Sequence, residues 1–534
     1  MLKFPHLFEQ IICKLNNTSL FKSREVARSW TYLINERNYP WLCVVNIPKV
    51  LHKSDTYLNL AAATGQLDAF KIALSKEEDK NIKNGLGATF FHLACMNGRF
   101  NIVEHSIEST SLNIDVNVRV DDIYQQTGFI LACRTGHSEV VKILTENALT
   151  LNIDLNTQDQ YGCTGFYWAC MKGHLDVIKI LLENAASVDL NIQHKSGGTA
   201  LHVACRWPRT NVVKILMESS ATSSIDLSAK DNKGQTAFHY ACSWGHTNVV
   251  KIFMESSATL SIDLNAKDHA GQTAFHLACR CDYINGNAFR KTSNYIKAVK
   301  MIMDNSAILN IDFNAKDHKG QTAFHLACKF DNINVAKIFM ENSASLNIDL
   351  NAKDNDGRTA FHLACRLNHF SVAKTFMDNS ATLGIDLNAK DKTGQSVFHL
   401  ACRWGCTNVV QMIMENSATL SIDLNAKDNA GQTAFHLACK FNHFNVANMI
   451  VENSITMNID LNAKTNVGQS AFHMASRWGC INVVKMIIEN STILNIDLNS
   501  KNNAGWRAFH MARNKEVYEL MLNNANTFKI DVTK

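Results

Sequence analysis

The sequence contains little proline, little charge and no long apolar segment. Four prolines occur among 534 residues, and charged residues account for 19% of the chain. So few prolines leave long stretches free to form helices. No run of roughly eighteen apolar residues could span a membrane, and the amino terminus lacks the charged start and apolar core of a secretory signal. We therefore expect a soluble chain with no membrane partner, in the cytoplasm or the nucleus.

Catalytic motifs are also missing from the sequence. It has no glycine-rich phosphate loop, no HExxH pair and no nucleophile elbow. Sixteen cysteines are present, yet none of them forms a CxxC pair. We expect no enzyme, no cofactor and no bound metal.

The positive charge is confined to one end of the chain. Residues 1–54 carry eight Lys or Arg and three Asp or Glu, which accounts for the whole net charge of +5. The remaining residues are balanced, and a balanced chain is a poor match to the electrostatic footprint of a nucleic-acid binder. We expect no nucleic-acid partner.

A recurring phrase close to Gly-Gln-Thr-Ala-Phe-His-Leu-Ala-Cys dominates the rest of the chain. Every interval between its histidines is 37 residues from His202 to His276 and again from His325 onward. The histidine, or the residue in its place, stands at Asn59, His92, Ile130, Tyr167, His202, His239, His276, His325, His362, His399, His436, His473 and His510. Such a fixed period predicts an all-α solenoid in which each repeat contacts its neighbours.

Residues 394–430 show how one repeat folds. Ser396 is suited to cap a short first helix, and Gly405 supplies the left-handed conformation that ends it. The second helix has the 3, 4 spacing of a buried stripe, formed by Val409, Val410, Ile413 and Met414. The Asp, Asn and Gly that follow favour an extended loop that folds back on itself.

These repeats resemble the ankyrin repeat, whose pattern reads D-x-x-G-x-T-P-L-H-x-A. The likeness covers about residues 55–534, and it implies about thirteen repeats with long hairpin-like loops and a C-terminal capping repeat. Alanine replaces the ankyrin proline, and the period exceeds the family's period of about 33 residues. The excess falls after the second helix. The resemblance also implies that the recurrent histidine ties the helix start to the adjacent loop, rather than binding zinc.

Ten cysteines occupy one slot of the repeat. Equivalent positions in stacked helices lie roughly 8 to 10 Å apart, beyond the roughly 7 Å that a disulfide spans. We expect them to be small buried packing residues. They are Cys95, Cys133, Cys170, Cys205, Cys242, Cys279, Cys328, Cys365, Cys402 and Cys439.

Residues 4–42 do not follow the repeat, and the spacing of their apolar residues fits a small set of packed helices. They resemble the F-box, although Leu7 replaces its usual acid and Ala27 replaces a cysteine. The resemblance implies that a domain of residues 1–54 binds the Skp-type adaptor of cullin-RING ubiquitin ligases. The adaptor-binding residues would be Pro5, Ile11, Leu15, Leu20, Val26 and Trp30. The alternative is a helical cap that shields the first repeat.

A cation beside an aromatic residue recurs where the first helices end. In ankyrin proteins, loop tips and these helix ends line a concave groove, so the resemblance implies a target-binding site there. Aromatic residues and arginine suit an acidic or aromatic-bearing peptide. The candidates are Arg206, Trp207, Trp244, Lys329, Phe330, Arg403, Trp404, Lys440, Phe441, Arg477 and Trp478. Alternatively, the rings pack on the next repeat's loop and the cation stems cover apolar surface.

Two function hypotheses follow from these patterns. In the first, the chain is a substrate receptor of an SCF-type cullin-RING ubiquitin ligase, with the F-box on the adaptor and the groove on a target protein. In the second, it is an ankyrin scaffold or sequestering protein with no role in ubiquitination. An insertion near residues 281–297 is either a second contact site or a tolerated extension.

Overall fold

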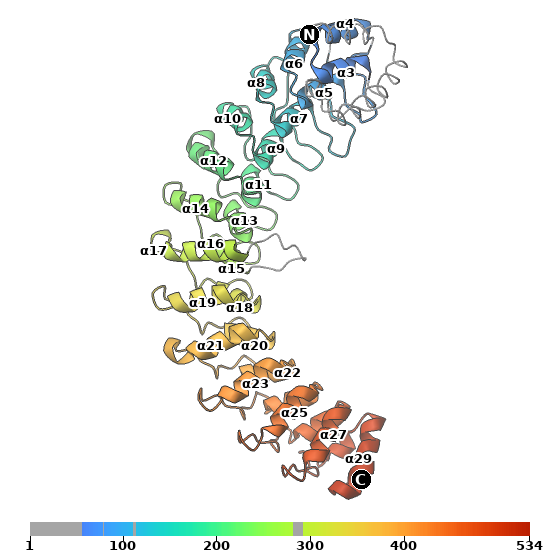
Figure 1. Cartoon of the computed structure of the whole chain (residues 1–534), viewed down its shortest axis with the longest axis vertical. Helices are drawn as coiled ribbons and strands as arrows, with labels where there is room; N and C mark the ends of the chain where they lie inside the picture. Colours follow the sequence, from blue (N-terminus) through green and yellow to red (C-terminus); the bar gives the residue numbers. More distant parts are fainter. Residues whose placement is uncertain (1–55, 78, 110–113, 281–291, 534) are drawn as a thin grey trace, which may run out of the picture. The chain divides into compact units, whose positions relative to one another are not determined.

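The computed structural model describes residues 56–77, 79–109, 114–280 and 292–533, and within them every regular element is a helix. The helices form consecutive pairs, each with a short first helix and a second helix, and a tight turn joins the two wherever the connection is described (Figure 1). Across these residues, the one isolated β-bridge joins Lys267 and Thr273. A first helix stands at each of the thirteen predicted positions, which confirms the α-solenoid fold class. The predicted domain of residues 1–54 lies outside the described residues.

The contacts divide the chain into two compact units. The first unit holds the described residues up to Ala241 together with Asn248–Asp263. Its first helices are α3 (Tyr57–Thr64), α5 (Phe90–Met96), α7 (Gly128–Thr135), α9 (Gly165–Lys172) and α11 (Ala200–Arg206). Its second helices are α4 (Leu67–Lys76), α6 (Phe100–Glu108), α8 (Ser138–Glu146), α10 (Leu175–Glu183) and α12 (Thr210–Ser223). The division passes through α13 (Ala237–Ser243) and α14 (Thr247–Ser256).

The second unit comprises Cys242–Thr247 and Leu264–Lys534. Its first helices are α15 (Ala274–Arg280), α18 (Ala323–Lys329), α20 (Ala360–Arg366), α22 (Val397–Arg403), α24 (Ala434–Lys440), α26 (Ala471–Arg477) and α28 (Ala508–Met511). Its second helices are α16 (Thr292–Asp304) with the short α17 (Ser306–Leu309), α19 (Ile333–Asn342), α21 (Phe370–Leu383), α23 (Thr407–Asn416), α25 (Phe444–Glu452), α27 (Ile481–Asn490) and α29 (Lys515–Phe528).

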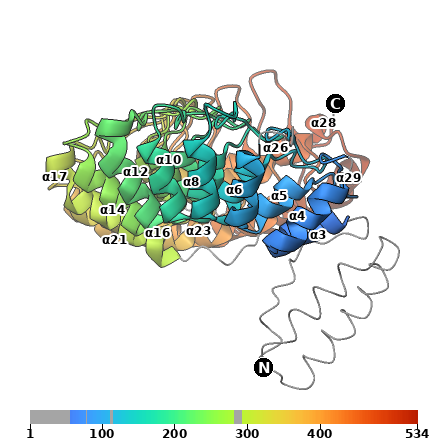
Figure 2. The same ribbon diagram turned by 90° about the horizontal axis from the view of Figure 1, so that it is seen from above.

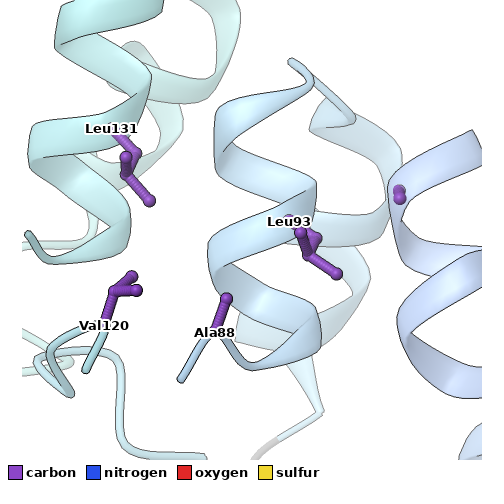
Figure 3. Packing of buried hydrophobic residues seen from close by; sticks show 5 residues of the cluster. Ala88, Leu93, Val120 and Leu131 are labelled. Atoms are coloured by element: carbon purple, nitrogen blue, oxygen red, sulfur yellow. The ribbon is translucent and has the colours of Figure 1, made fainter. Parts of the chain in front are cut away.

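Each repeat buries its apolar faces against the next one. Figure 2 shows α6, α8, α10 and α12 side by side in the first unit. Figure 3 shows Leu93 of α5 and Leu131 of α7 beside the loop residues Ala88 and Val120 in one buried cluster. The ten cysteines of the repeat slot are fully buried, and burial raises the pKa of thiols such as Cys402 well above its usual value. These thiols are therefore unreactive packing groups, as predicted.

The recurrent histidine joins one repeat to the next. Nδ1 of buried His325 accepts the backbone N–H of Thr322 at 3.2 Å, and its Nε2 donates to the carbonyl of Arg358 in the following repeat at 3.0 Å. The predicted structural role is confirmed, and both ring nitrogens are occupied. The same bridge to a following loop is made by His92, His202, His276, His362, His399, His436 and His473.

The four residues added to the ankyrin period lie after the second helix, where the sequence predicted them. In this segment Ser421 has φ +51°, and Asn388 of the preceding repeat donates to its carbonyl at 2.9 Å. Oδ1 of Asn388 accepts the N–H of Asp423 at 3.1 Å. The asparagine thus satisfies both exposed backbone groups of the longer loop. The same pair of bonds is made by Asn117, Asn156, Asn191, Asn265, Asn314, Asn351, Asn425, Asn462 and Asn499.

The turn between the helices is matched to the neighbouring repeat. Gly405 has φ +68°, and a Cβ there would lie 2.5 Å from Nδ1 of His443, whose Nε2 donates to the carbonyl of Arg403 at 2.8 Å. Where this slot holds Asn442, at φ +59°, the residue that reaches back is the smaller Cys480, with Sγ 3.9 Å from the carbonyl of Lys440. In this repeat a side chain in the turn is combined with a small residue in the next repeat, whereas Asp331, at φ +57°, fills the same slot beside His369, with Oδ2 3.8 Å from its Nδ1.

We expect Gly405→Asn to lower the free energy of unfolding by about 1–3 kcal/mol, because the added Cβ forces His443 to shift and the backbone has φ +68°. Adding His443→Cys recreates the Asn442 and Cys480 combination and should restore most of that loss. Urea unfolding of both single variants and the double variant measures the coupling. Strictly additive losses would contradict this account of the turn.

Acid should weaken the repeats through their buried histidines. Burial is the main cause that lowers the pKa of His92, His362 and His436 from 6.5 to about 4. The unfolded chain therefore binds more protons between these values, so stability is full above about pH 6.5 and falls as the pH drops towards 4. By about pH 5 each of these histidines should remove about 2 kcal/mol. Urea unfolding at neutral pH and at about pH 5 tests this, and equal stability at both would contradict it.

Candidate protein-binding surface

The predicted groove residues occupy one place in successive repeats. The cation is the last residue of its first helix, and the ring follows at the helix end, as with Arg403 of α22 and Trp404. Trp207, Trp404, Phe441 and Trp478 are between 40% and 59% exposed. Phe330 and Trp244 are partly buried. These helix ends thus carry large aromatic surfaces that the fold leaves open to solvent.

In the second unit, four of these rings each receive the cation of the preceding repeat. The guanidinium carbon of Arg366 lies 4.8 Å from the centre of the Trp404 ring, and that of Arg403 lies 5.2 Å from Phe441. Both distances are within the range of a cation–π interaction. Two further pairs are Arg280 with Phe330 at 5.3 Å and Lys440 with Trp478 at 5.9 Å. We call these four pairs the cation–ring ladder.

Arg280 belongs to this ladder, although it is not among the groove residues predicted from the sequence. It stands four residues after His276, in the slot that Lys329 and Arg403 occupy in their own repeats. Its partner Phe330 lies 50 positions away because the insertion separates the two repeats. The slot position alone would have identified Arg280 as a candidate.

Positive charge accumulates along these helix ends. Burial first, and then the neighbouring Lys319 and Arg280, lower the pKa of Lys329. The pKa of Arg366 is lowered by burial and then by Arg358 and Arg403. Carboxylates of the same loops are occupied: buried Asp391 accepts the backbone N–H groups of Thr393 and Gln395. The helix ends therefore present cations that no neighbouring carboxylate neutralises fully.

In the first unit, Arg134 lies against the rings of Tyr124 and Trp168 in an arrangement that differs from the ladder. The guanidinium carbon of Arg134 lies 4.8 Å from the Tyr124 ring centre and 4.7 Å from that of Trp168. Trp168 is 8% exposed and donates its indole N–H to Asp159 at 2.8 Å. Trp168 and its partners are therefore fixed within the fold, unlike the exposed rings of Trp404, Phe441 and Trp478.

The predicted adaptor-binding residues and most of the insertion lie outside the described residues, and the described part of the insertion has a structural role. Pro5, Ile11, Leu15, Leu20, Val26 and Trp30 lie outside the described residues, as does 281–291 of the insertion. Tyr295, within the predicted insertion range of 281–297, is 2% exposed and donates its hydroxyl to the carbonyl of Ser243 at 2.9 Å. It is therefore not available as part of a second contact site. Within the described residues no helix is both long and apolar enough to cross a bilayer.

The repeats match a known family. The model for ankyrin repeats in three copies matches residues 58–159, 147–231, 221–289, 287–391 and 380–465. The chain belongs to the ankyrin-repeat family. The repeat identity inferred from sequence is thereby confirmed, and the ankyrin repeats make this chain a protein-interaction module.

Two individual proteins are similar to parts of this ankyrin-repeat chain. Alpha-latroinsectotoxin-Lt1a of Latrodectus tredecimguttatus is 35% identical over 69 residues, which are 13% of this chain and 5% of the toxin. The crystal structure of the ankyrin repeat domain of Bcl-3, a member of the IkappaB protein family, aligns with 47% of this chain and 99% of its own. That alignment has 22% identity and a TM-score of 0.38.

The exposed ladder rings should contribute little to ankyrin-repeat stability. We expect Trp404→Ala to lower the free energy of unfolding by about 1 kcal/mol or less, because it removes one exposed cation–π contact. Phe398→Ala, which empties a fully buried site in the same helix, should cost about 3–5 kcal/mol. Urea unfolding compares the two, and similar losses would mean that Trp404 is a packing residue.

Proposed function

We propose that the chain is the substrate receptor of an SCF-type cullin-RING ubiquitin ligase. In this role the cation–ring ladder holds a segment of a target protein, and residues 1–54 dock on a Skp-type adaptor. The chain itself supplies no catalytic residue, because ubiquitin transfer belongs to other subunits. The protein would meet its ligase in the cytoplasm or the nucleus.

The observation that carries the binding half of this proposal is the ladder. Its rings Trp404, Phe441 and Trp478 are between 40% and 59% exposed, and its cations lie beside the rings without full neutralisation by carboxylates. Aromatic and arginine side chains that are exposed in a free protein are the types that dominate binding energy in interfaces. The positive charge favours a target segment rich in Asp or Glu.

The ligase half rests on the resemblance of residues 4–42 to the F-box. Its apolar positions, among them Leu20 and Trp30, match the pattern that binds the adaptor in that family. About forty residues form a marginal core by themselves, and burial against an adaptor would add stability. The second candidate remains a scaffold or sequestering protein that uses the same ladder without ubiquitination.

Two variants of the full chain separate these functions. Leu20→Ala combined with Trp30→Ala should lose the adaptor and cullin in pull-downs while it keeps the target proteins. Trp404→Ala combined with Trp478→Ala should keep the adaptor and weaken target capture by at least about tenfold, the scale of interface hot spots. Quantitative mass spectrometry of the captured proteins gives both readouts.

The outcomes distinguish the two candidates. A native chain that captures targets but no adaptor is a scaffold. An adaptor that remains undiminished on the folded Leu20 and Trp30 variant contradicts the assigned docking residues. Targets that remain on the Trp404 and Trp478 variant contradict the ladder as the binding surface.

A further inference from the structure

The cation–ring ladder is interrupted at one repeat of the second unit. Leu367 stands at the end of α20, where Trp404, Phe441 and Trp478 stand in later repeats. Lys329 of the preceding repeat therefore meets no ring there. Its Nζ lies 5.7 Å from the ring of its own neighbour Phe330.

A pocket of about 480 Å³ lies at this interruption. The ends of α18 and α20 form one part of it, and the loops before these helices form the other. Leu363 and Leu367 supply apolar lining, and Leu367 is 44% exposed. The cations that line it are Lys319, Lys329, Arg358 and Arg366.

Three of these cations form no ion pair with a carboxylate among the described residues. Arg358 is paired with Asp356 at 2.6 Å. Asp354 is buried and accepts the backbone N–H groups of Asp356 and Arg358 at 2.9 and 2.8 Å. Lys319, Lys329 and Arg366 thus leave the pocket with a surplus of positive charge. Burial first, and then repulsion from cations that include Lys319 and Arg366, lowers the pKa of Lys329.

The pocket also contains an unsatisfied buried acceptor. In other repeats an arginine donates to the equivalent glutamine, as Arg134 does to Oε1 of Gln126 at 2.8 Å and Arg403 to Gln395 at 3.4 Å. Lysine replaces this arginine at position 329, and Oε1 of Gln321, which is 6% exposed, has no hydrogen-bond partner. A bound N–H group would remove the cost of this unpaired oxygen.

We propose that this pocket is a subsite for an anionic side chain, a carboxylate or a phosphoryl group, on the protein segment held by the ladder. Lys319, Lys329 and Arg366 bind the anion through charge-assisted hydrogen bonds. Leu363 and Leu367 contact the aliphatic part of the same residue, and a backbone N–H of the segment donates to Gln321. This subsite rests on the proposed target-binding role of the ladder.

Selection of displayed random peptides on the full chain tests the subsite without a known partner. Sequencing should show Asp or Glu enriched at one fixed position. Selected peptides are then synthesised with Glu, Gln or phosphoserine at that position. Replacing Glu by Gln should weaken binding by about tenfold or more, since a charge-assisted contact is lost. Tighter binding of phosphoserine than of Glu assigns the natural anion as phosphoryl, and weaker binding assigns it as carboxylate.

Two variants change the pocket in different ways. Leu367→Trp gives Lys329 the ring that other repeats provide and fills the space, so the preference for Glu over Gln should disappear while the peptides still bind the rest of the ladder. Lys319→Gln with Lys329→Gln should remove the same preference without filling the pocket. Lys337→Gln with Lys374→Gln, on the exposed sides of α19 and α21, makes a matched loss of two charges and should leave the preference unchanged.

Each result bears on a different claim. Ladder-dependent peptides with no acidic position overturn the subsite and leave the proposed function standing. A preference for Glu that survives both pocket variants, with urea unfolding showing them folded, also overturns it. A chain that selects no peptide, or selects peptides that Trp404→Ala with Trp478→Ala still binds, contradicts the ladder itself and the subsite with it.

Discussion

The buried histidine bridge is the interaction on which the rest of each repeat depends. One neutral imidazole caps the start of its own helix and hydrogen-bonds the loop of the next repeat, as His399 does from Ser396 to the carbonyl of Gln432. Because the same side chain does both, correct capping and correct stacking occur together. An imidazolium could not accept the N–H of Ser396, so the bridge requires the neutral form that burial favours.

The fixed stacking turns single slots of the repeat into continuous rows of contacts. Lys353 donates to the carbonyl of Lys390 at 3.0 Å, and Lys390 donates to that of Lys427 at the same distance. The asparagine hydrogen bonds and the cation–ring ladder also recur from repeat to repeat, because each repeat contacts its neighbours through the same positions. One substitution in a slot therefore changes the surface locally without changing the stacking, and Leu367 in a ring position opens a pocket in this way.

The sequence predicted the structural features that depend on residues within one repeat. It did not predict the side-chain contacts that depend on how two neighbouring repeats are placed. Caps, turn glycines and the excess after the second helix follow from local preferences, and the histidine role followed from the ankyrin resemblance. The placement of Arg366 on Trp404 requires the orientation of two stacked helices, which periodicity does not contain. Likewise, Tyr295 falls within the range predicted for the insertion, so its structural position in the repeat was hidden. Overall charge balance also concealed how charge is distributed within each repeat.

That distribution explains why the helix ends, rather than the second helices, are suited to recognition. On the second helices, Lys251 faces Glu255 at 3.6 Å and Lys485 faces Glu489 at 3.8 Å, so their charges are balanced locally. A ring partner differs from a carboxylate because it orients a cation without cancelling its charge. Arg366 on Trp404 has therefore lost part of its rotamer freedom before any target binds, while its field still attracts an acidic segment. The ladder combines preorganisation with unneutralised charge, two properties that a row of salt bridges could not provide together.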